Sequence, residues 1–380
     1  MNATPPGPVA ETTNHVSSHR KLVTDGVIAR PAEINAIIVP TARTVGYLRT
    51  AMELARAQGC ILVVLCSKRA SAEAAFRLAR DIGTEILAVD LPRLGLAKRL
   101  LPAFHSSAIL RGTRFDRHTD TSTKRNLGLL LALVAKYDRI LFLDDDISVP
   151  RVEDLNEAAG LLDDYHGVGL SIGGFWDNSV VCHAFRDSGG AQDTFIGGGA
   201  LAIGQRSYDS FFPNVYNEDW FFLLGDNGLR PSAMTGQVKQ QPYDPYRDGE
   251  RARSEEFGDT LAEGLFSLLT NGKDLTGATE AYWRHFLRKR RAFIDEVLEM
   301  AMDADMFEAE RSRMITALKA ARGRNALIEP EFCVRYLEAW RADRRIWQKH
   351  VAQVQHRYHR GGLEKLLADI GLMHCYRGAA

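Results

Sequence analysis

Short apolar segments that alternate with helical patterns constrain the fold of this chain more than any other feature. Three of them occupy residues 34–40 (INAIIVP), 61–67 (ILVVLCS) and 85–92 (EILAVDLP), and a fourth, RILFL, begins at residue 139. Each has the length of one buried strand. Helical patterns over about residues 47–58, 71–81 and 121–138 separate them. This order predicts an α/β fold, in which helices cover a mostly parallel sheet and ligands bind at the carboxyl ends of the strands.

The fourth apolar segment runs directly into Asp144, Asp145 and Asp146. Carboxylates crowded at the exit of a buried strand repel one another and lose hydration, so such a cluster usually needs a cation. Oxygen ligands suit Mg²⁺ or Mn²⁺, which share their remaining positions with substrate phosphates. Strand geometry of period two predicts that Asp144 and Asp146 point to one side and hold the metal together. The alternative is a solvated acidic turn that caps the next helix, which the preceding strand-helix units disfavour.

The motif Lys124-Arg125-Asn126-x-Gly128, a helix and then RILFLDDDI resembles the nucleotide-binding core of GT-A glycosyltransferases, especially the family-two group. This resemblance implies a Rossmann-like sheet with flanking helices, a metal held by Asp144 and Asp146, and a nucleoside-diphosphate sugar as donor. A helix start with two cations also favours an anionic phosphate, although a solvated helix end is the alternative for both cations. The donor site implied in this way comprises Pro40, Thr41, Arg43, Asp90, Lys124, Arg125, Asp144, Asp145, Gly198 and Gly199.

The chain departs from the family pattern after the second strand. Family members often carry acidic residues there that read the base, whereas this chain has Cys66-Ser67-Lys68. Asp90, after the third strand, is the residue left for that role. The sequence therefore leaves the identity of the base open.

A second acidic pair, Glu218-Asp219, follows the glycine-rich segment FIGGGALAIG and begins a predicted helix. In inverting family members the Asp of this pair is the general base that deprotonates the acceptor hydroxyl. The resemblance therefore implies Asp219 as base, with Glu218 as second choice. The alternative is that the pair only complements the helix N-terminus. Because the inverting mechanism rests on Asp219 alone, a retaining mechanism stays open.

Family-two enzymes often place a third metal ligand, commonly His, further along the chain. No His occurs between His183 and His285, so Asp244 is the substitute that we expect, although Asp-Pro is also a common turn. Arg247, Arg251 and Arg253 either close over a diphosphate or form a solvated face, and we expect the solvated alternative more strongly for residues 289–291.

Composition limits the class of protein. The 380 residues carry 48 Lys and Arg against 48 Asp and Glu, a balance that argues against a nucleic-acid-coating protein. The five cysteines are scattered without a C-x-x-C pair, which indicates reduced thiols and a cytoplasmic location. No apolar run reaches the roughly 20 residues of a membrane helix, and no secretory signal is recognised.

We expect three segments along the chain: a mobile tail over residues 1–30, a GT-A domain over 31–274 and a helical C-terminal subdomain over 275–380. Residues 93–120 are expected to form a long loop, with Thr121 or Ser122 as the N-cap of the following helix. The helical subdomain is left with three roles, which are acceptor binding, homo-oligomer formation and contact with a membrane surface.

The expected function is metal-dependent transfer of a sugar to a hydroxyl acceptor, which is a small molecule, a glycan or a lipid-linked molecule. One alternative is a nucleotidyltransferase that makes nucleotide sugars, but VPTARTVGYL lacks the usual glycine-rich phosphate loop after the first strand. Another is a non-catalytic module that binds a sugar or nucleotide. P-loop and dinucleotide-binding motifs do not occur after any predicted strand.

Overall fold

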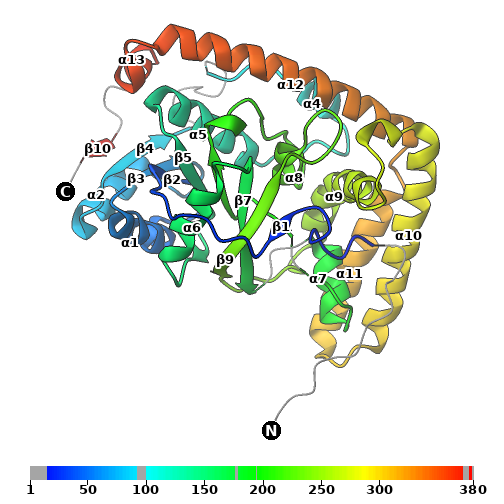
Figure 1. Cartoon of the computed structure of the whole chain (residues 1–380). Helices are drawn as coiled ribbons and strands as arrows, with labels where there is room; N and C mark the ends of the chain where they lie inside the picture. Colours follow the sequence, from blue (N-terminus) through cyan, green and yellow to red (C-terminus); the bar gives the residue numbers. More distant parts are fainter. Residues whose placement is uncertain (1–14, 92–99, 176–178, 194, 371–375, 379–380) are drawn as a thin grey trace. The chain divides into compact units, whose positions relative to one another are not determined.

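A computed structural model describes residues 15–91, 100–175, 179–193, 195–370 and 376–378 (Figure 1). The chain divides into two compact units, each built from separate stretches of sequence. The sheet unit comprises residues 20–177, 195–243 and 335–380, and the helical unit comprises 1–19, 178–194 and 244–334. These units do not coincide with the three expected segments, because composition along a chain does not record which distant stretches pack together.

The sheet unit contains a ten-stranded mixed sheet in the order β1-β9-β7-β8-β5-β2-β3-β4-β10, with β6 paired to β9. Parallel pairing joins β5, β2, β3 and β4, as the alternating apolar segments predict. β8 runs antiparallel between β5 and β7. The strands are β1 (Thr24–Asp25), β2 (Ala36–Thr41), β3 (Ile61–Cys66), β4 (Ile86–Asp90), β5 (Arg139–Leu143), β6 (Ile147–Ser148), β7 (Gly167–Gly174), β8 (Ala200–Gly204), β9 (Ser232–Gln240) and β10 (Tyr376–Gly378).

The helices of the sheet unit include the three that the sequence predicts between the first four apolar segments, α1, α2 and α5. The described helices of this unit are η1 (Val45–Leu48), α1 (Arg49–Gln58), α2 (Ala72–Ile82), α4 (His105–Leu110), α5 (Thr121–Ala135), α6 (Glu153–Leu161), η3 (Gln205–Ser207), α8 (Glu218–Leu223), α13 (Gly362–Asp369) and most of α12 (Pro330–Tyr358). The aromatic stripe of α12, which includes Trp340 and Trp347, is buried in this unit.

Helices cover both faces of the sheet (Figure 1). One face of the sheet is covered by α1, α2 and α6. Their apolar side chains pack against Ile37 and Val39 of β2 and against buried side chains of the neighbouring strands. α5 packs on the opposite face, where a Cβ atom at Gly128 would lie 2.8 Å from Ile38 Cγ2 and 3.2 Å from Phe142 Cε1. The glycine of the K-R-N-x-G motif therefore lets α5 approach the strands closely.

Three local predictions need correction. α4 lies inside the expected loop 93–120, of which residues 93–99 are outside the described part. Thr24 and Asp25, in the expected tail, form a strand that pairs with β9. Composition predicts a mobile segment there because it does not record backbone hydrogen bonds to a distant strand. Residues 1–14 of the expected tail are outside the described part. Neither Thr121 nor Ser122 is the N-cap: α5 begins at Thr121 after Asp120, and the Ser122 hydroxyl donates to Pro213 O.

The helical unit packs around an apolar core of Phe293, Ile294, Val297, Met314 and their neighbours. Its helices are α7 (Val180–Asp187), α9 (Gly249–Thr270), η4 (Leu275–Gly277), α10 (Glu280–Asp303) and α11 (Glu308–Asn325). Arg290, expected on a solvated face, is instead fully buried against carboxylates of α9. Arg247 and Arg253 are exposed, and Arg251 forms an ion pair with Glu255.

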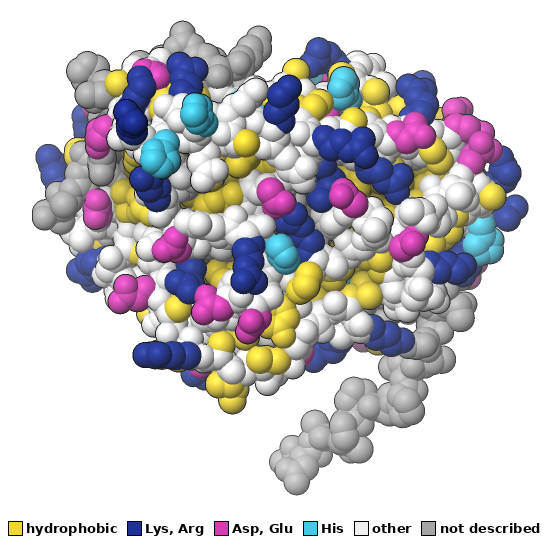
Figure 2. All heavy atoms as spheres, turned by 45° about the horizontal axis from the view of Figure 1, so that its top comes forward, with side chains coloured by type: hydrophobic (Ala, Val, Ile, Leu, Met, Phe, Trp, Pro, Cys, Tyr) yellow, Lys and Arg dark blue, Asp and Glu magenta, His cyan; other side chains and the backbone are white. Residues whose placement is uncertain are grey.

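Charged side chains of both signs are scattered over the face drawn in Figure 2, as a net charge of zero leads one to expect. Within the described residues, none of the helices has the length and apolar character needed to cross a membrane.

Candidate functional site

The three aspartates follow β5 at the carboxyl end of the parallel strands. The strand ends at Leu143, and a turn follows in which Ile147 N donates to Asp144 O at 3.1 Å. The alternation expected of a continuing strand therefore does not reach Asp146. Instead Asp145 and Asp146 share one partner, and Asp144 has another.

Arg43, in the loop after β2, is the partner that Asp145 and Asp146 share. Its Nη2 atom lies 2.6 Å from Asp146 Oδ2, and its Nη1 atom lies 3.3 Å from Asp145 Oδ1. Thr41 Oγ1 donates to Asp145 Oδ2 at 2.6 Å. Burial raises the pKa of Asp145, while Thr41 and Arg43 act in the opposite direction. The Arg43 side chain is 38% exposed and lies over the Tyr47 ring, so it can leave the carboxylates without opening the core.

Arg125 joins the two acidic segments, which lie far apart in the sequence. Its Nη2 atom donates to Asp144 Oδ1 at 3.1 Å, and its Nη1 atom donates to Glu218 Oε1 at 2.9 Å. The side chain is only 4% exposed. A buried guanidinium between two carboxylates fixes the distance between the β5 exit and the start of α8.

The glycine-rich segment lies against this bridge. A Cβ atom at Gly198 would come within 2.7 Å of Arg125 Cζ, so only glycine leaves room for the guanidinium. Gly198 N also donates to Asp219 Oδ2, and Gly199 O accepts from Asp144 N at 2.9 Å. The segment thereby connects the acidic turn after β5 to the acidic pair at the start of α8.

Asp219 is partly buried at the start of α8, as the sequence predicts for a helix that begins with this pair. Its Oδ1 atom accepts from Trp220 N at 2.9 Å. Burial raises its pKa most, the neighbouring Glu218 raises it further, and Arg125 lowers it. The Asp219 carboxylate therefore combines a raised pKa with a position that two backbone N–H groups hold.

Lys124 is placed differently from a phosphate ligand. Its Nζ atom donates to Thr41 O at 2.8 Å, Ser67 Oγ at 2.6 Å and Asp120 Oδ1 at 2.9 Å. These contacts use its three donors, and the side chain is 2% exposed. Direct contact with a diphosphate would require breaking this network, so Lys124 ties the ends of β2 and β3 to α5.

Two other predicted residues have partners of their own. Asp90, at the end of β4, accepts from Ala72 N at 2.8 Å and so caps α2. Asp244 belongs to the helical unit, where its carboxylate accepts from Tyr246 N at 2.9 Å and lies 3.7 Å from Arg313 Nε. Pro40 lies within β2, next to Thr41.

Sequence reasoning missed Arg117. Its Nη1 atom lies 3.3 Å from Glu218 Oε2 and donates to Val215 O at 3.1 Å. The segment around it, RFDRH, contains no regular pattern that could have singled it out.

The charge of the site leaves room for a cation. Among the described residues of the site, five carboxylates face three guanidinium groups, a formal difference of two negative charges. The carboxylates are Asp144, Asp145, Asp146, Glu218 and Asp219, and the cations are Arg43, Arg117 and Arg125. Among the described residues, the acidic turn does not bring three protein ligands together, so a metal there would take most of its ligands from substrate and water.

No protein-family model matches the chain, and no curated protein is similar to it in sequence. Among solved structures, a mannosyltransferase from Pyrobaculum calidifontis in complex with GDP-Man and Mn²⁺ is similar at 15% identity and a TM-score of 0.45, over 79% of this chain and 90% of that one. A mycobacterial protein is similar at 15% identity and a TM-score of 0.40, over 64% and 76% of the two chains. At such low identities and TM-scores neither likeness decides the function.

Proposed function

We propose that this chain is a metal-dependent glycosyltransferase of GT-A type, which moves a sugar from a nucleoside diphosphate to a hydroxyl acceptor. The observation that carries the proposal is the bridge that Arg125 makes between Asp144 and Glu218. Through this bridge, the acidic turn at the strand exits and the acidic start of α8 form one site. Such a site has a place for a charged donor and, beside it, a carboxylate that can take a proton.

Asp146 and Asp144 are the residues that would hold Mn²⁺ or Mg²⁺. The bound metal would neutralise negative charge on the departing diphosphate. In the structure, Arg43 forms an ion pair with the Asp146 carboxylate, and this ion pair has to open before Asp146 can bind a cation. The exposed position of Arg43 permits that movement, and the released guanidinium is suited to bind a phosphate of the donor.

Asp219 is the proposed base. A sugar hydroxyl is a poor nucleophile until a base takes its proton, and a base with a raised pKa is better matched to that task than an ordinary Asp. Gly198 N and Trp220 N hold the Asp219 carboxylate in place. Transfer at an inverted anomeric centre follows if this carboxylate removes the proton as the hydroxyl attacks. Glu218, which binds two arginines, is better suited to holding the site together.

The remaining residues would shape the donor pocket. Thr41, Arg43, Asp145 and Gly199 surround the acidic turn by the contacts described above. Lys124 we assign to positioning, since its ammonium group already has three acceptors. Asp244 stays the proposed third protein ligand of the metal.

The test is release of nucleoside diphosphate from UDP-, GDP- and dTDP-sugars, with Mn²⁺ and with EDTA, while calorimetry measures nucleotide binding to the same protein. We expect metal-dependent release from one donor, which Asp146→Asn and Asp219→Asn abolish. Asp163→Asn is the matched control, because the Asp163 side chain is 70% exposed and pairs with Arg139, away from the acidic turn and the start of α8.

The two variants should differ in binding. Asp146→Asn should lose metal-dependent nucleotide binding, whereas Asp219→Asn should keep it. For the wild type, the rate should fall as pH drops through the raised pKa of Asp219, since the base must be ionised. Nucleotide binding without turnover would support the non-catalytic alternative, and absence of both would refute the proposal.

A further inference from the structure

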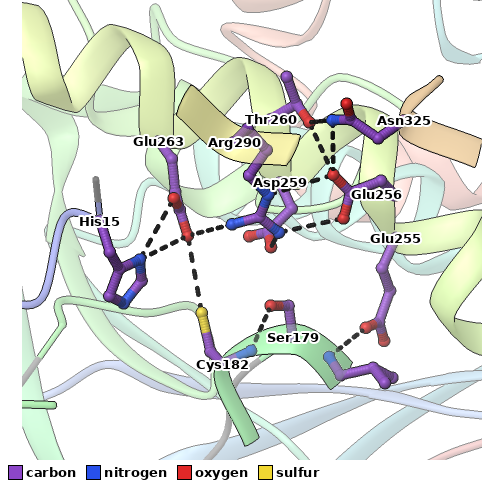
Figure 3. Close-up of polar contacts among 11 residues, drawn as sticks. His15, Ser179, Cys182, Glu255, Glu256, Asp259, Thr260, Glu263, Arg290 and Asn325 are labelled. Carbon is purple, nitrogen blue, oxygen red and sulfur yellow. Dashed lines mark hydrogen bonds and ion pairs between the residues drawn. The ribbon is translucent and has the colours of Figure 1, made fainter. Parts of the chain in front are cut away.

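A buried ionic cluster lies in the helical unit, outside the proposed active site (Figure 3). α9 presents Glu256, Asp259 and Glu263 along one face, and Arg290 of α10 lies among them. The Arg290 guanidinium lies 3.0 Å from the Glu256 carboxylate, 2.6 Å from that of Asp259 and 2.8 Å from that of Glu263. Three carboxylates against one guanidinium leave a surplus of negative charge, which burial makes costly.

Two further side chains approach Glu263 from other parts of the unit. His15 Nδ1 lies 3.3 Å from Glu263 Oε1, and Cys182 Sγ of α7 lies 3.6 Å from the same oxygen. Figure 3 shows the Glu263 carboxylate between the imidazole, the thiol and Arg290. One ligand atom from each of His15, Cys182 and Glu263 fits within a span of 4.8 Å.

The two separations from Glu263 Oε1 match two edges of a tetrahedral zinc site. Zinc binds nitrogen and oxygen at ~2.0–2.1 Å and sulfur at ~2.3 Å, so tetrahedral geometry puts N and O about 3.3 Å apart and S and O about 3.6 Å apart. Both values agree with those found here. As a hydrogen bond, by contrast, the His15–Glu263 contact is long, with a distance of 3.4 Å from Nδ1 to Oε2.

The surroundings of His15 give an independent indication. Its side chain is fully buried, and its ring stacks on Phe293 with 4.4 Å between the ring centroids. Within the described part of the chain, Nε2 is buried without a hydrogen-bond partner. The ring thus makes its polar contact through Nδ1, which is aimed at Glu263. Because the Nδ1 contact with Glu263 is long for a hydrogen bond, this buried nitrogen can take a cation as a stronger ligand.

We propose that His15, Cys182 and Glu263 bind a Zn²⁺-type divalent cation, which fastens the segment before β1 to α7 and α9. On binding, the cation replaces the proton of the Cys182 thiol, which passes to solvent, and water fills the fourth position. Arg290 keeps its contact with Glu263 and balances the neighbouring carboxylates. Because thiolate and imidazole favour zinc over Mn²⁺ and Mg²⁺, this site is distinct in chemistry from the all-oxygen site at Asp144 and Asp146.

The experiment uses the full chain, stripped of metal and titrated with Co²⁺ as a spectroscopic probe for the zinc site. We expect a thiolate-to-cobalt charge-transfer band at one equivalent, which one equivalent of Zn²⁺ removes. Cys182→Ser should abolish the band, and His15→Gln should weaken Co²⁺ binding by about tenfold or more. Cys333→Ser is the control, since Cys333 is equally buried in the same unit, and it should leave the band intact.

Asp146→Asn separates this inference from the proposed function, because it should leave the band unchanged while it removes donor-dependent metal binding. Zn²⁺ should also raise the thermal midpoint of the wild type and not that of Cys182→Ser. Folding of the variants is checked by circular dichroism in the metal-free state. Absence of a charge-transfer band in the wild type, or its persistence in folded Cys182→Ser, would overturn the proposal in favour of a metal-free hydrogen-bonded cluster.

Discussion

Replacing Gly198 by Ala tests whether the site depends on the position of Arg125. The added Cβ atom would lie 2.7 Å from Arg125 Cζ and 2.8 Å from Nη2, well inside van der Waals contact. The φ angle of Gly198 is outside the left-handed region, so Ala brings no backbone penalty of its own. The guanidinium must therefore move by roughly an ångström, since carbon–nitrogen contacts are relaxed only near ~3.5 Å.

That movement breaks at least one arm of the bridge. The arms measure 2.9 Å to Glu218 and 3.1 Å to Asp144, and neither can lengthen by an ångström and remain a hydrogen bond. A charge-assisted hydrogen bond of this kind contributes about 1.5–3 kcal/mol, so we expect a stability loss of that size. If the donor and base sites share this bridge, a misplacement of about 1 Å lowers kcat/KM by roughly 100-fold.

Thermal unfolding and donor turnover, measured on the same preparations, check both numbers. Gly46→Ala is the matched control, because no atom of the described residues lies within 4 Å of a Cβ atom there and its φ is likewise permissive. It should behave as the wild type in both assays. If Gly198→Ala were as stable and as active as Gly46→Ala, Arg125 would not be held against Gly198, and the acidic turn and the start of α8 would not depend on it as one site.

Three further predictions concern the acidic turn, the buried cluster and the helix-sheet contact. Arg43→Gln should bind Mn²⁺ up to about fivefold more tightly than the wild type, because the ion pair that the cation displaces, with a 38% exposed arginine, contributes at most ~1 kcal/mol. Paramagnetic resonance titrations without nucleotide measure this affinity. Weaker binding would contradict competition between Arg43 and the cation for Asp146. Burial and the neighbouring carboxylates raise the pKa of Asp259 to about 7, against the opposing effect of Arg290, so its contribution to stability is complete at low pH and lost as pH rises through 7. Asp259→Asn should therefore stabilise the metal-free protein by about 2–4 kcal/mol at pH 8 and by clearly less at pH 5 in denaturant titrations; a pH-independent difference would refute this. Gly128→Val should lower stability by about 1–3 kcal/mol in the same assay, because its methyl groups enter space held by Ile38 and Phe142; an unchanged midpoint would argue against the close contact of α5.

The four buried strands β2, β3, β4 and β5 and the helices α1, α2 and α5 between them could be predicted because their apolar periodicity is local. Each of the runs 61–66, 86–90 and 139–143 is buried along nearly its whole length, as a doubly covered strand requires. The order of the other strands could not be predicted in this way. β8 lies between β5 and β7 although Ala200 comes long after Leu143 in the sequence, and no periodicity records that pairing.

The candidate site shows the same division. The acidic turn and the Glu218-Asp219 pair stood out because chemistry and position coincide in a few consecutive residues. The sequence identifies Arg43 and Arg125 as cations near a donor. It does not predict which carboxylates each of them pairs with, because those pairs form between residues that are far apart in the sequence. Arg290 was misread because lysine and arginine neighbours on a helix usually face water, and its three partners lie on a different helix, α9.

The two edges of the sheet have a practical consequence for anyone who modifies this protein. β1, of two residues, pairs with β9 at one edge, and β10, of three residues, pairs with β4 at the other. Short strands of this kind cover backbone donors and acceptors that would otherwise template pairing with another chain. Deleting residues 376–380, or disrupting them with a fused tag, would bare the backbone of β4. Aggregation of such a truncated protein would then reflect an unprotected sheet edge and not a failure of the core.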